Sequence, residues 1–160
     1  SMTEINDLVG GVTVTVPNND LAAKHPDLKE GSVVTLDDSN VEDFLRYRDI
    51  QTDFSNEGRI QRQQAYITAY IGQFRELLQT DLESAWDKTE EMTDHLQTSI
   101  TKSKYLGLAK LLESVSFDDT DYYRPEGTDQ LGDLHDEFYL DEDNMEKLII
   151  DLFYEPISQT

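Results

Sequence analysis

The alternation of apolar and polar residues predicts two short strands near the N-terminus. Residues 12–16 alternate valine with threonine, and all five side chains are β-branched. Two glycines precede this run and Pro17 ends it. Residues 31–36 form a second strand candidate. The link between the two runs is too long for a tight hairpin, but the strands can still pair as a small sheet.

Helical spacing dominates the middle of the chain. Ser39 and Glu42 have the capping-box spacing, which predicts a helix of about ten residues. A much longer pattern starts near Arg59, continues into the 80s and predicts a central helix of about 40 Å. Its apolar residues recur at intervals of three, four or seven: Ile60, Ile67, Ile71, Phe74, Leu78, Leu82 and Trp86. We expect helix packing through the part of this stripe from Ile67 to Leu78.

Further helices are predicted after the central one. The pattern is weak over 91–99 and firmer between Tyr105 and Val115. Residues 117–129 are typical of a loop, and Leu131, Leu134 and Phe138 suggest a short helix. The last helix begins at an Asp143-x-x-Glu146 cap and presents five apolar residues on one face. These are Met145, Leu148, Ile149, Leu152 and Phe153.

Together these elements predict an α-rich fold, mainly α with a small α+β element. We expect a helical bundle around one long central helix, with two short N-terminal β-strands. Three segments follow from the patterns: an N-terminal β element over 2–38, a helical core over 39–116, and a strongly acidic helical C-terminal segment over 117–160. With 160 residues, the three segments are expected to pack as a single domain.

Negative charge is concentrated at one end of the chain. The formal net charge is −21, and residues 113–155 alone hold 15 carboxylates against two cations. Such a charge opposes direct binding to nucleic acids and to anionic membranes. Cysteine is absent, which excludes disulfides and thiolate sites and fits a cytoplasmic protein. No signal peptide or membrane-spanning stretch is visible, and we therefore expect a cytoplasmic location.

The acidic end suggests a binding surface for a basic partner. Carboxylates on a helix lie about 5–6 Å apart, comparable with the phosphate spacing of nucleic acids. In size, missing cysteine and acidic helical pattern, the chain resembles the small inhibitors that phages and mobile elements make against host nucleases. We expect a non-enzymatic nucleic-acid mimic that occludes a basic surface of a nucleic-acid-handling protein. The predicted partner-binding residues are Asp118, Asp119, Asp121, Asp133, Asp136, Glu137, Asp141, Glu142, Asp143 and Asp151.

An alternative function remains open from the same pattern. Phage morphogenesis adaptors and tail-assembly chaperones are also small, acidic and helical, and they bind through apolar helical surface. In that case the negative charge serves solubility, and tyrosine and leucine side chains carry the binding. Binding that survives 0.5 M salt would favour this alternative.

Catalytic, cofactor and metal sites find no support in the sequence. His25, His95 and His135 belong to no metal-binding motif and are expected at the surface, and no nucleophile motif or phosphate loop occurs. A modest cationic group surrounds the first two predicted helices. It can bind the chain's own acidic end or that of a neighbouring copy, and the second arrangement gives a homo-oligomer. The group comprises Arg46, Arg48, Arg59, Arg62 and Arg75.

Overall fold

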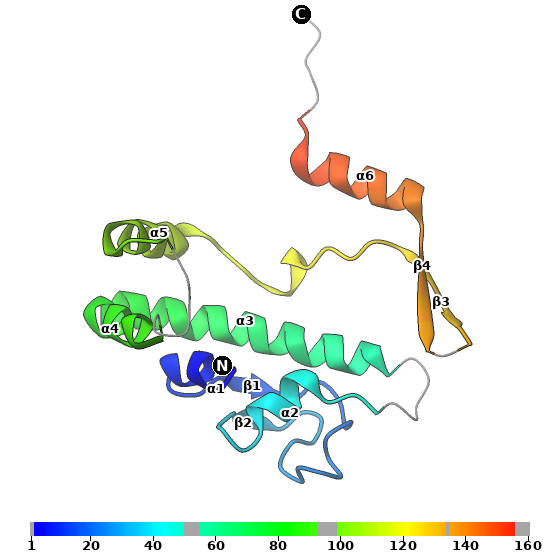
Figure 1. Cartoon of the computed structure of the whole chain (residues 1–160), viewed down its shortest axis with the longest axis horizontal. Coiled ribbons are helices and arrows are strands. Elements are labelled where there is room, and N and C mark those ends of the chain that lie inside the picture. Colours follow the sequence, from blue (N-terminus) through cyan, green and yellow to red (C-terminus); the bar gives the residue numbers. More distant parts are fainter. Residues whose placement is uncertain (1, 50–54, 93–98, 134, 156–160) are drawn as a thin grey trace, which may run out of the picture.

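The computed structural model describes residues 2–49, 55–92, 99–133 and 135–155 (Figure 1). Its N-terminal half contains α1 (Met2–Leu8), β1 (Thr13–Thr15), β2 (Val33–Thr35), α2 (Val41–Arg46) and the long α3 (Asn56–Thr80). The remainder contains α4 (Leu82–Met92), α5 (Lys102–Ser114), the 3₁₀ turn η2 (Asp119–Asp121), β3 (Gly127–Leu131), β4 (Asp136–Leu140) and α6 (Glu142–Phe153). No helix in these ranges is long and apolar enough to cross a membrane.

β1 and β2 form the small antiparallel sheet that the sequence predicts. Val14 lies opposite Val34, with Thr13 opposite Thr35. A short helix, α1, precedes the sheet and was not predicted. Asn6 of α1 is fully buried, where its side chain donates to the Leu36 carbonyl at 2.7 Å and accepts from the Val12 amide at 3.0 Å. The buried amide therefore fixes α1 against both strands.

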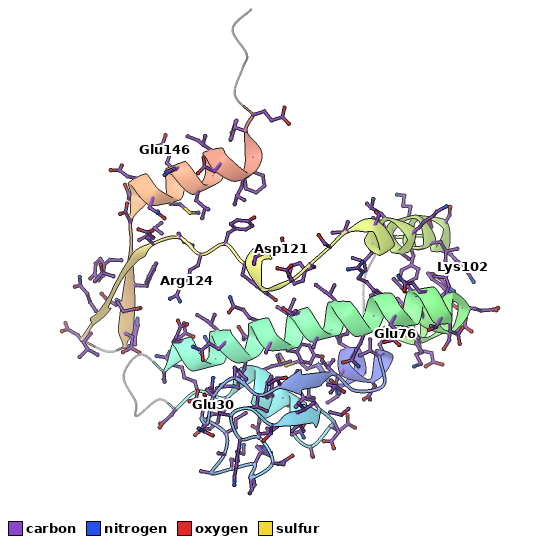
Figure 2. The ribbon with its side chains drawn as sticks, turned by 180° about the vertical axis from the view of Figure 1, so that it is seen from behind. Glu30, Glu76, Lys102, Asp121, Arg124 and Glu146 are labelled. Atoms are coloured by element: carbon purple, nitrogen blue, oxygen red, sulfur yellow. The ribbon has the colours of Figure 1, made fainter. Side chains whose placement is uncertain are left out.

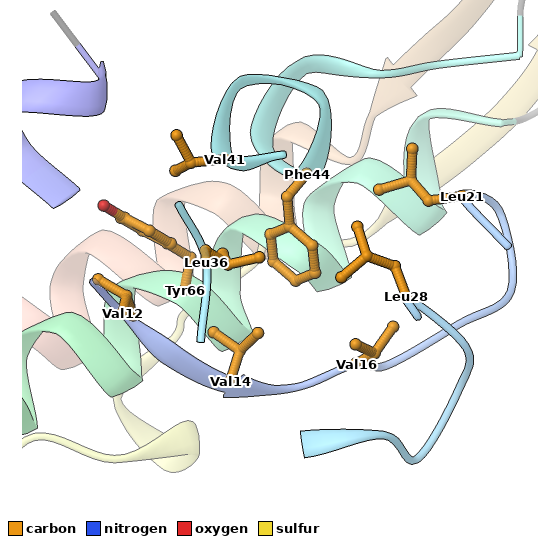
Figure 3. Packing of buried hydrophobic residues seen from close by; sticks show 9 residues of the cluster. All are labelled: Val12, Val14, Val16, Leu21, Leu28, Leu36, Val41, Phe44 and Tyr66. Carbon is orange, nitrogen blue, oxygen red and sulfur yellow. The ribbon is translucent and has the colours of Figure 1, made fainter. Parts of the chain in front are cut away.

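The main core lies between the β1–β2 sheet, α2 and one face of α3 (Figure 3). Phe44 of α2 is its largest fully buried apolar side chain, and Tyr66 is the buried contribution of α3. The other members come from the strands, α2 and the connection between the strands: Val12, Val14, Val16, Leu21, Leu28, Leu36 and Val41. Most of this core is thus supplied by residues outside the long helix.

The predicted helical bundle is therefore wrong. The fold combines helices with two small antiparallel sheets. The expected packing stripe of α3 is only partly used, because Ile67 is 42% exposed and the core contacts come from Tyr66 and Arg62 one helical turn apart. Spacing alone cannot distinguish two adjacent helical faces that both carry apolar residues.

A second, smaller cluster closes the C-terminal end of α3. Leu78, Ala85 of α4 and Ala109 of α5 are buried there, with Phe74, Leu77 and Leu112 packed against them. The predicted uninterrupted helix into the 80s ends at Thr80, and Asp81 separates it from α4. The weak pattern over 91–99 falls largely on residues 93–98, outside the described residues.

The C-terminal segment differs most from the prediction. Leu131 and Phe138, assigned to a short helix, belong to the antiparallel hairpin β3–β4, with Asp129 opposite Phe138. Local turn chemistry explains the difference: Gly132 donates to the His135 carbonyl at 3.1 Å and closes the hairpin. The final helix is confirmed, although Asp141 rather than Asp143 caps it by accepting from the Asn144 amide at 2.9 Å.

Candidate functional site

A polar pocket of about 320 Å³ lies where the hairpin meets the N-terminal end of α3. Figure 2 shows Arg124 between this end of α3 and the hairpin. Three parts of the chain supply the walls: the segment after α2, the first turn of α3, and residues 124–138. The lining residues are Arg48, Asn56, Glu57, Arg124, Asp129, Asp136, Glu137 and Phe138.

Arg48 holds one side of the pocket together. Its Nη2 donates to Asp136 Oδ2 of β4 at 2.7 Å, and its Nε donates to Ser55 Oγ at 3.0 Å. Both members of the ion pair are largely covered, with side-chain exposures of 29% and 17%. The guanidinium therefore links the end of α2, the start of α3 and the hairpin.

Arg124 occupies the opposite side. Its Nη1 donates to Glu57 Oε2 at 2.6 Å, and its guanidinium carbon lies 5.8 Å from the Phe138 ring centroid. Both partners of this ion pair are half-exposed. Pairs with that exposure contribute about 0–1 kcal/mol, so Arg124 can exchange Glu57 for another anion at little cost.

Arg59 lies beside the pocket and has an unpaired donor. Its Nη2 donates to Asn56 Oδ1 at 2.6 Å, which connects it to the lining, while its Nε is buried without a hydrogen-bond partner. Within the described residues, the other buried side-chain atom of this kind is Tyr66 Oη in the main core. A buried N–H that lacks an acceptor costs about 1–3 kcal/mol, more when charged. Because Arg59 is not itself a lining residue, an oxygen bound in the pocket could satisfy this N–H only after a local rearrangement.

Arg62 has a structural role. Its side chain is fully buried, with Nε donating to the Phe44 carbonyl at 2.9 Å and Nη2 to the Tyr47 carbonyl. Nη1 donates to Asn18 Oδ1 at 3.1 Å and to Asp20 Oδ2 at 2.6 Å. All three nitrogens are thus occupied, and Arg62 fixes α3 against α2 and the loop after β1.

The pocket contains an arginine group that can bind an anion. Guanidinium groups present planar forks of donors that match carboxylate and phosphate oxygens. The carboxylates of Glu57 and Asp136 already occupy two of these forks. A ligand with several anionic oxygens, such as a phosphate, would therefore compete with internal carboxylates. Within the described residues no cluster of three His, Asp or Glu side chains is placed to hold a metal.

The ten predicted partner-binding carboxylates do not form one surface. Asp136 and Glu137 line the pocket, the first bound to Arg48 and the second accepting from Tyr139 Oη at 2.7 Å. Two others lie at the ends of η2, where Asp118 accepts from the Thr120 amide and Asp121 from the Asp118 amide. The rest are distributed over η2, the hairpin turn and α6: Asp119, Asp133, Asp141, Glu142, Asp143 and Asp151. Their role in binding a partner stays a prediction.

The sequence indicated a cationic group around the first two helices but no binding site, and left two arrangements open for it. The Arg48–Asp136 pair corresponds to the first arrangement, in which the chain binds its own acidic end. Arg124 lies in the acidic segment, outside the predicted cationic group. The sequence held no local signal for the pocket, because its two lining arginines, Arg48 and Arg124, are 76 residues apart.

One histidine departs from the expected surface position. His25 has a side-chain exposure of 18%, and its Nε2 lies 2.7 Å from Asp43 Oδ2. Lys24 Nζ bonds the same carboxylate at 2.7–2.8 Å. Together these hydrogen bonds, that from Lys24 first, lower the pKa of Asp43. The hydrogen bonds of Lys24 and His25 to Asp43 therefore hold the connection between β1 and β2 against α2.

The fold resembles those of three solved bacterial proteins. TagV from B. subtilis aligns with a TM-score of 0.68 and 21% identity over 97% of this chain and 61% of that one. TagU from B. subtilis aligns with a TM-score of 0.61 and 15% identity over 99% of this chain and 64% of that one. The Lin1025 protein from Listeria innocua aligns with a TM-score of 0.61 and 23% identity over 92% of this chain and 62% of that one. This chain thus spans a little over three fifths of these structures. No curated protein matches it.

A family model covers nearly the whole chain and corrects the functional predictions. The LytR_cpsA_psr family model matches residues 1–152. TagU and TagV are cell wall teichoic acid transferases. The predicted nucleic-acid mimic, the phage adaptor and the nucleic-acid-handling partner are therefore wrong. The expectation of a non-enzymatic protein is also wrong, because family members such as TagU and TagV are enzymes. This chain belongs to the LytR_cpsA_psr family.

Proposed function

We propose that this chain takes part in the transfer of a phosphate-linked cell-wall polymer, and that the pocket at the start of α3 binds a phosphate group of the donor. Membership of the family and the resemblance to TagU and TagV support the type of reaction. The observation that carries the assignment is the pair of lining arginines, Arg48 and Arg124, together with Arg59, which bonds the lining Asn56 and has a buried, unpaired Nε.

The chemistry of phosphate transfer fits an arginine-lined site. Negative charge on the phosphate oxygens must be stabilised while the bond to the leaving group breaks, and cationic clamps supply this stabilisation. Arg124 and Arg59 are suited to this role, because the first has an exchangeable partner and the second has a free donor. Arg48 is more firmly bound and would hold the hairpin wall in position.

Carboxylates in the lining compete with an incoming anion for the arginines. Four of them, Glu57, Asp129, Asp136 and Glu137, face the same pocket as Arg48 and Arg124. An anion must therefore displace at least the Glu57 carboxylate to reach Arg124. This competition predicts that the pocket binds a doubly charged phosphate better than a singly charged carboxylate ligand of similar size.

The direct test is binding of inorganic pyrophosphate to the full chain. Calorimetry measures the affinity, and NMR shifts of the arginine side chains report which of them contact the ligand. We expect Arg59→Gln and Arg124→Gln each to weaken binding at least tenfold. Arg46→Gln is the matched control, because Arg46 pairs with Glu42 on the exposed side of α2. Equal affinity in all three variants, or no binding by the wild-type chain, would reject the pocket assignment.

The transfer itself requires a second experiment. A lipid-linked, phosphate-bearing polymer would be incubated with peptidoglycan and the chain, and covalent attachment of the polymer would be measured. Arg59→Gln should reduce attachment more than Arg46→Gln. The predicted cytoplasmic location can be examined by fractionation, since transfer to the cell wall requires that the chain reach the outer face of the membrane.

A further inference from the structure

An apolar groove of about 370 Å³ lies between α3 and α5, at the opposite end of α3 from the arginine pocket. Phe74 of α3 lines one side, and the other lining residues include Leu108 and Leu111 of α5 and Val115 directly after it. Leu108 and Leu111 are more than half exposed, at 54% and 60%. Exposed apolar side chains grouped in this way are typical of a binding surface.

α6 presents a second uncovered apolar face. Met145, Leu148, Ile149 and Leu152 follow each other at helical spacing, and Phe153 extends the stripe. None of the residues of α6 is buried, and Phe153 is 76% exposed. Figures 1 and 2 both show α6 beyond the hairpin, apart from α5. A helix of this kind normally buries its apolar stripe against another element.

The two surfaces are complementary in charge and in length. α5 has three lysines against one glutamate, and α6 has four carboxylates against one lysine. Lys104 precedes the groove residues of α5 in sequence, Lys110 lies among them, and both are exposed. The helices contain 13 and 12 residues, which correspond to about 20 and 18 Å. An acidic amphipathic helix therefore fits along α5.

Tethers hold α6 away from the groove of its own chain. Tyr122 Oη donates to the Gln64 carbonyl at 3.1 Å, and the Arg124–Glu57 and Arg48–Asp136 pairs fasten the following segment to the start of α3. Glu57 and Phe74 are 17 residues apart on one helix, about 26 Å. The start of α6 is thus anchored near one end of α3, whereas the groove lies at the other.

We propose that α6 docks into the α3–α5 groove of a second copy of this chain, and that the exchange is reciprocal. A two-fold axis allows both copies to bury their apolar stripes at once, so the interface closes on itself as a dimer. The apolar stripe supplies the burial, and the lysines of α5 against the carboxylates of α6 set the orientation.

The absence of cysteine allows a direct test. A full chain carrying Leu111→Cys would be mixed with one carrying Ile149→Cys under mild oxidation. Docking brings the two Cα atoms within the roughly 7 Å that a disulfide requires. We expect a mixed disulfide of twice the 18.4 kDa chain mass, identified by the joined peptides after digestion. Lys147→Cys, on the opposite face of α6, is the matched control and should cross-link at least tenfold less.

Measurement of mass in solution supplies the second criterion. Light scattering should give a dimer for the unmodified chain and a monomer for Ile149→Asp combined with Leu152→Asp, whose circular dichroism should remain that of the folded chain. A monomeric unmodified chain would overturn the proposal. Equal cross-linking from both faces of α6, or an intrachain disulfide in a chain that carries both Leu111→Cys and Ile149→Cys, would overturn it as well.

Discussion

Arg48 and Asp136 lie 88 residues apart in the chain and meet through a 2.7 Å hydrogen bond between Nη2 and Oδ2. This contact links the segment after α2 to β4 and forms one wall of the arginine pocket. The charge pattern alone suggested that the acidic end serves an external partner. In the folded chain, part of that end binds an internal cation instead.

Replacement of Asp136 by Asn should loosen the hairpin. The pair is largely covered, so its loss should lower the free energy of unfolding by about 1–2 kcal/mol, between the values for exposed and buried pairs. Urea unfolding measures the loss, and hydrogen exchange should show faster exchange in β3 and β4. Glu42→Gln breaks the exposed Arg46–Glu42 pair and should cost no more than about 0.5 kcal/mol. Equal losses of stability in the two variants would show that the Arg48–Asp136 pair does not hold the hairpin in place.

Arg62 should be much less tolerant of substitution. Arg62→Ala leaves Asp20 and two backbone carbonyls without their donor and opens a cavity beside Phe44, so we expect a loss of about 3–5 kcal/mol. Arg46→Ala, on the exposed side of α2, should cost less than about 0.5 kcal/mol. Thermal unfolding of both variants measures the difference. Similar melting temperatures would contradict a structural role for Arg62.

Gly10 and Gly11 form a matched pair for substitution by alanine. Both have positive φ, +78° and +90°, so each substitution should cost about 1–2 kcal/mol in backbone strain. A Cβ at Gly11 would also lie 2.8 Å from the Leu36 carbonyl oxygen, whereas one at Gly10 meets nothing within 4 Å. Gly11→Ala should therefore be clearly the less stable variant in urea. The reverse order would contradict the described approach of the strands.

Stability should depend on the Asp43 carboxylate at low pH. Hydrogen bonds from Lys24 and His25 lower its pKa below the usual 3.8. A lowered folded pKa gives a contribution that is fully present above the unfolded pKa and is lost as the pH falls through the folded value. The free energy of unfolding should therefore decrease below about pH 3.8 by more in the wild type than in Asp43→Asn. Parallel pH profiles would contradict this.

Removal of the Glu57 carboxylate should strengthen phosphate binding. Glu57→Gln frees Arg124 from its 2.6 Å ion pair and removes one negative charge from the pocket lining. Calorimetry with pyrophosphate should show at least a threefold gain in affinity. Glu42→Gln removes an equal charge from α2, outside the pocket, and should leave affinity within twofold. Weaker binding by Glu57→Gln would contradict the competition between carboxylate and phosphate.

The sequence predicted local elements better than their assembly. The valine–threonine alternation located β1, and the stripe from Met145 to Phe153 located α6, because both signals arise from neighbouring residues. The hairpin over 127–140 was missed, since Leu131 and Phe138 are seven residues apart, which is a helical spacing, although they lie on two different strands. The pocket could not be predicted, because the Arg48–Asp136 and Arg124–Glu57 pairs join distant parts of the chain.

The composition of the main core has a consequence for the order of folding during synthesis. All nine buried members lie between Val12 and Tyr66, and the tether of Arg62 to Phe44, Tyr47 and Asp20 lies in the same stretch. A ribosome adds about 5–20 residues per second, so this part emerges several seconds before α6. We therefore expect the N-terminal half to condense on the nascent chain, giving the later hairpin a finished surface on which to close.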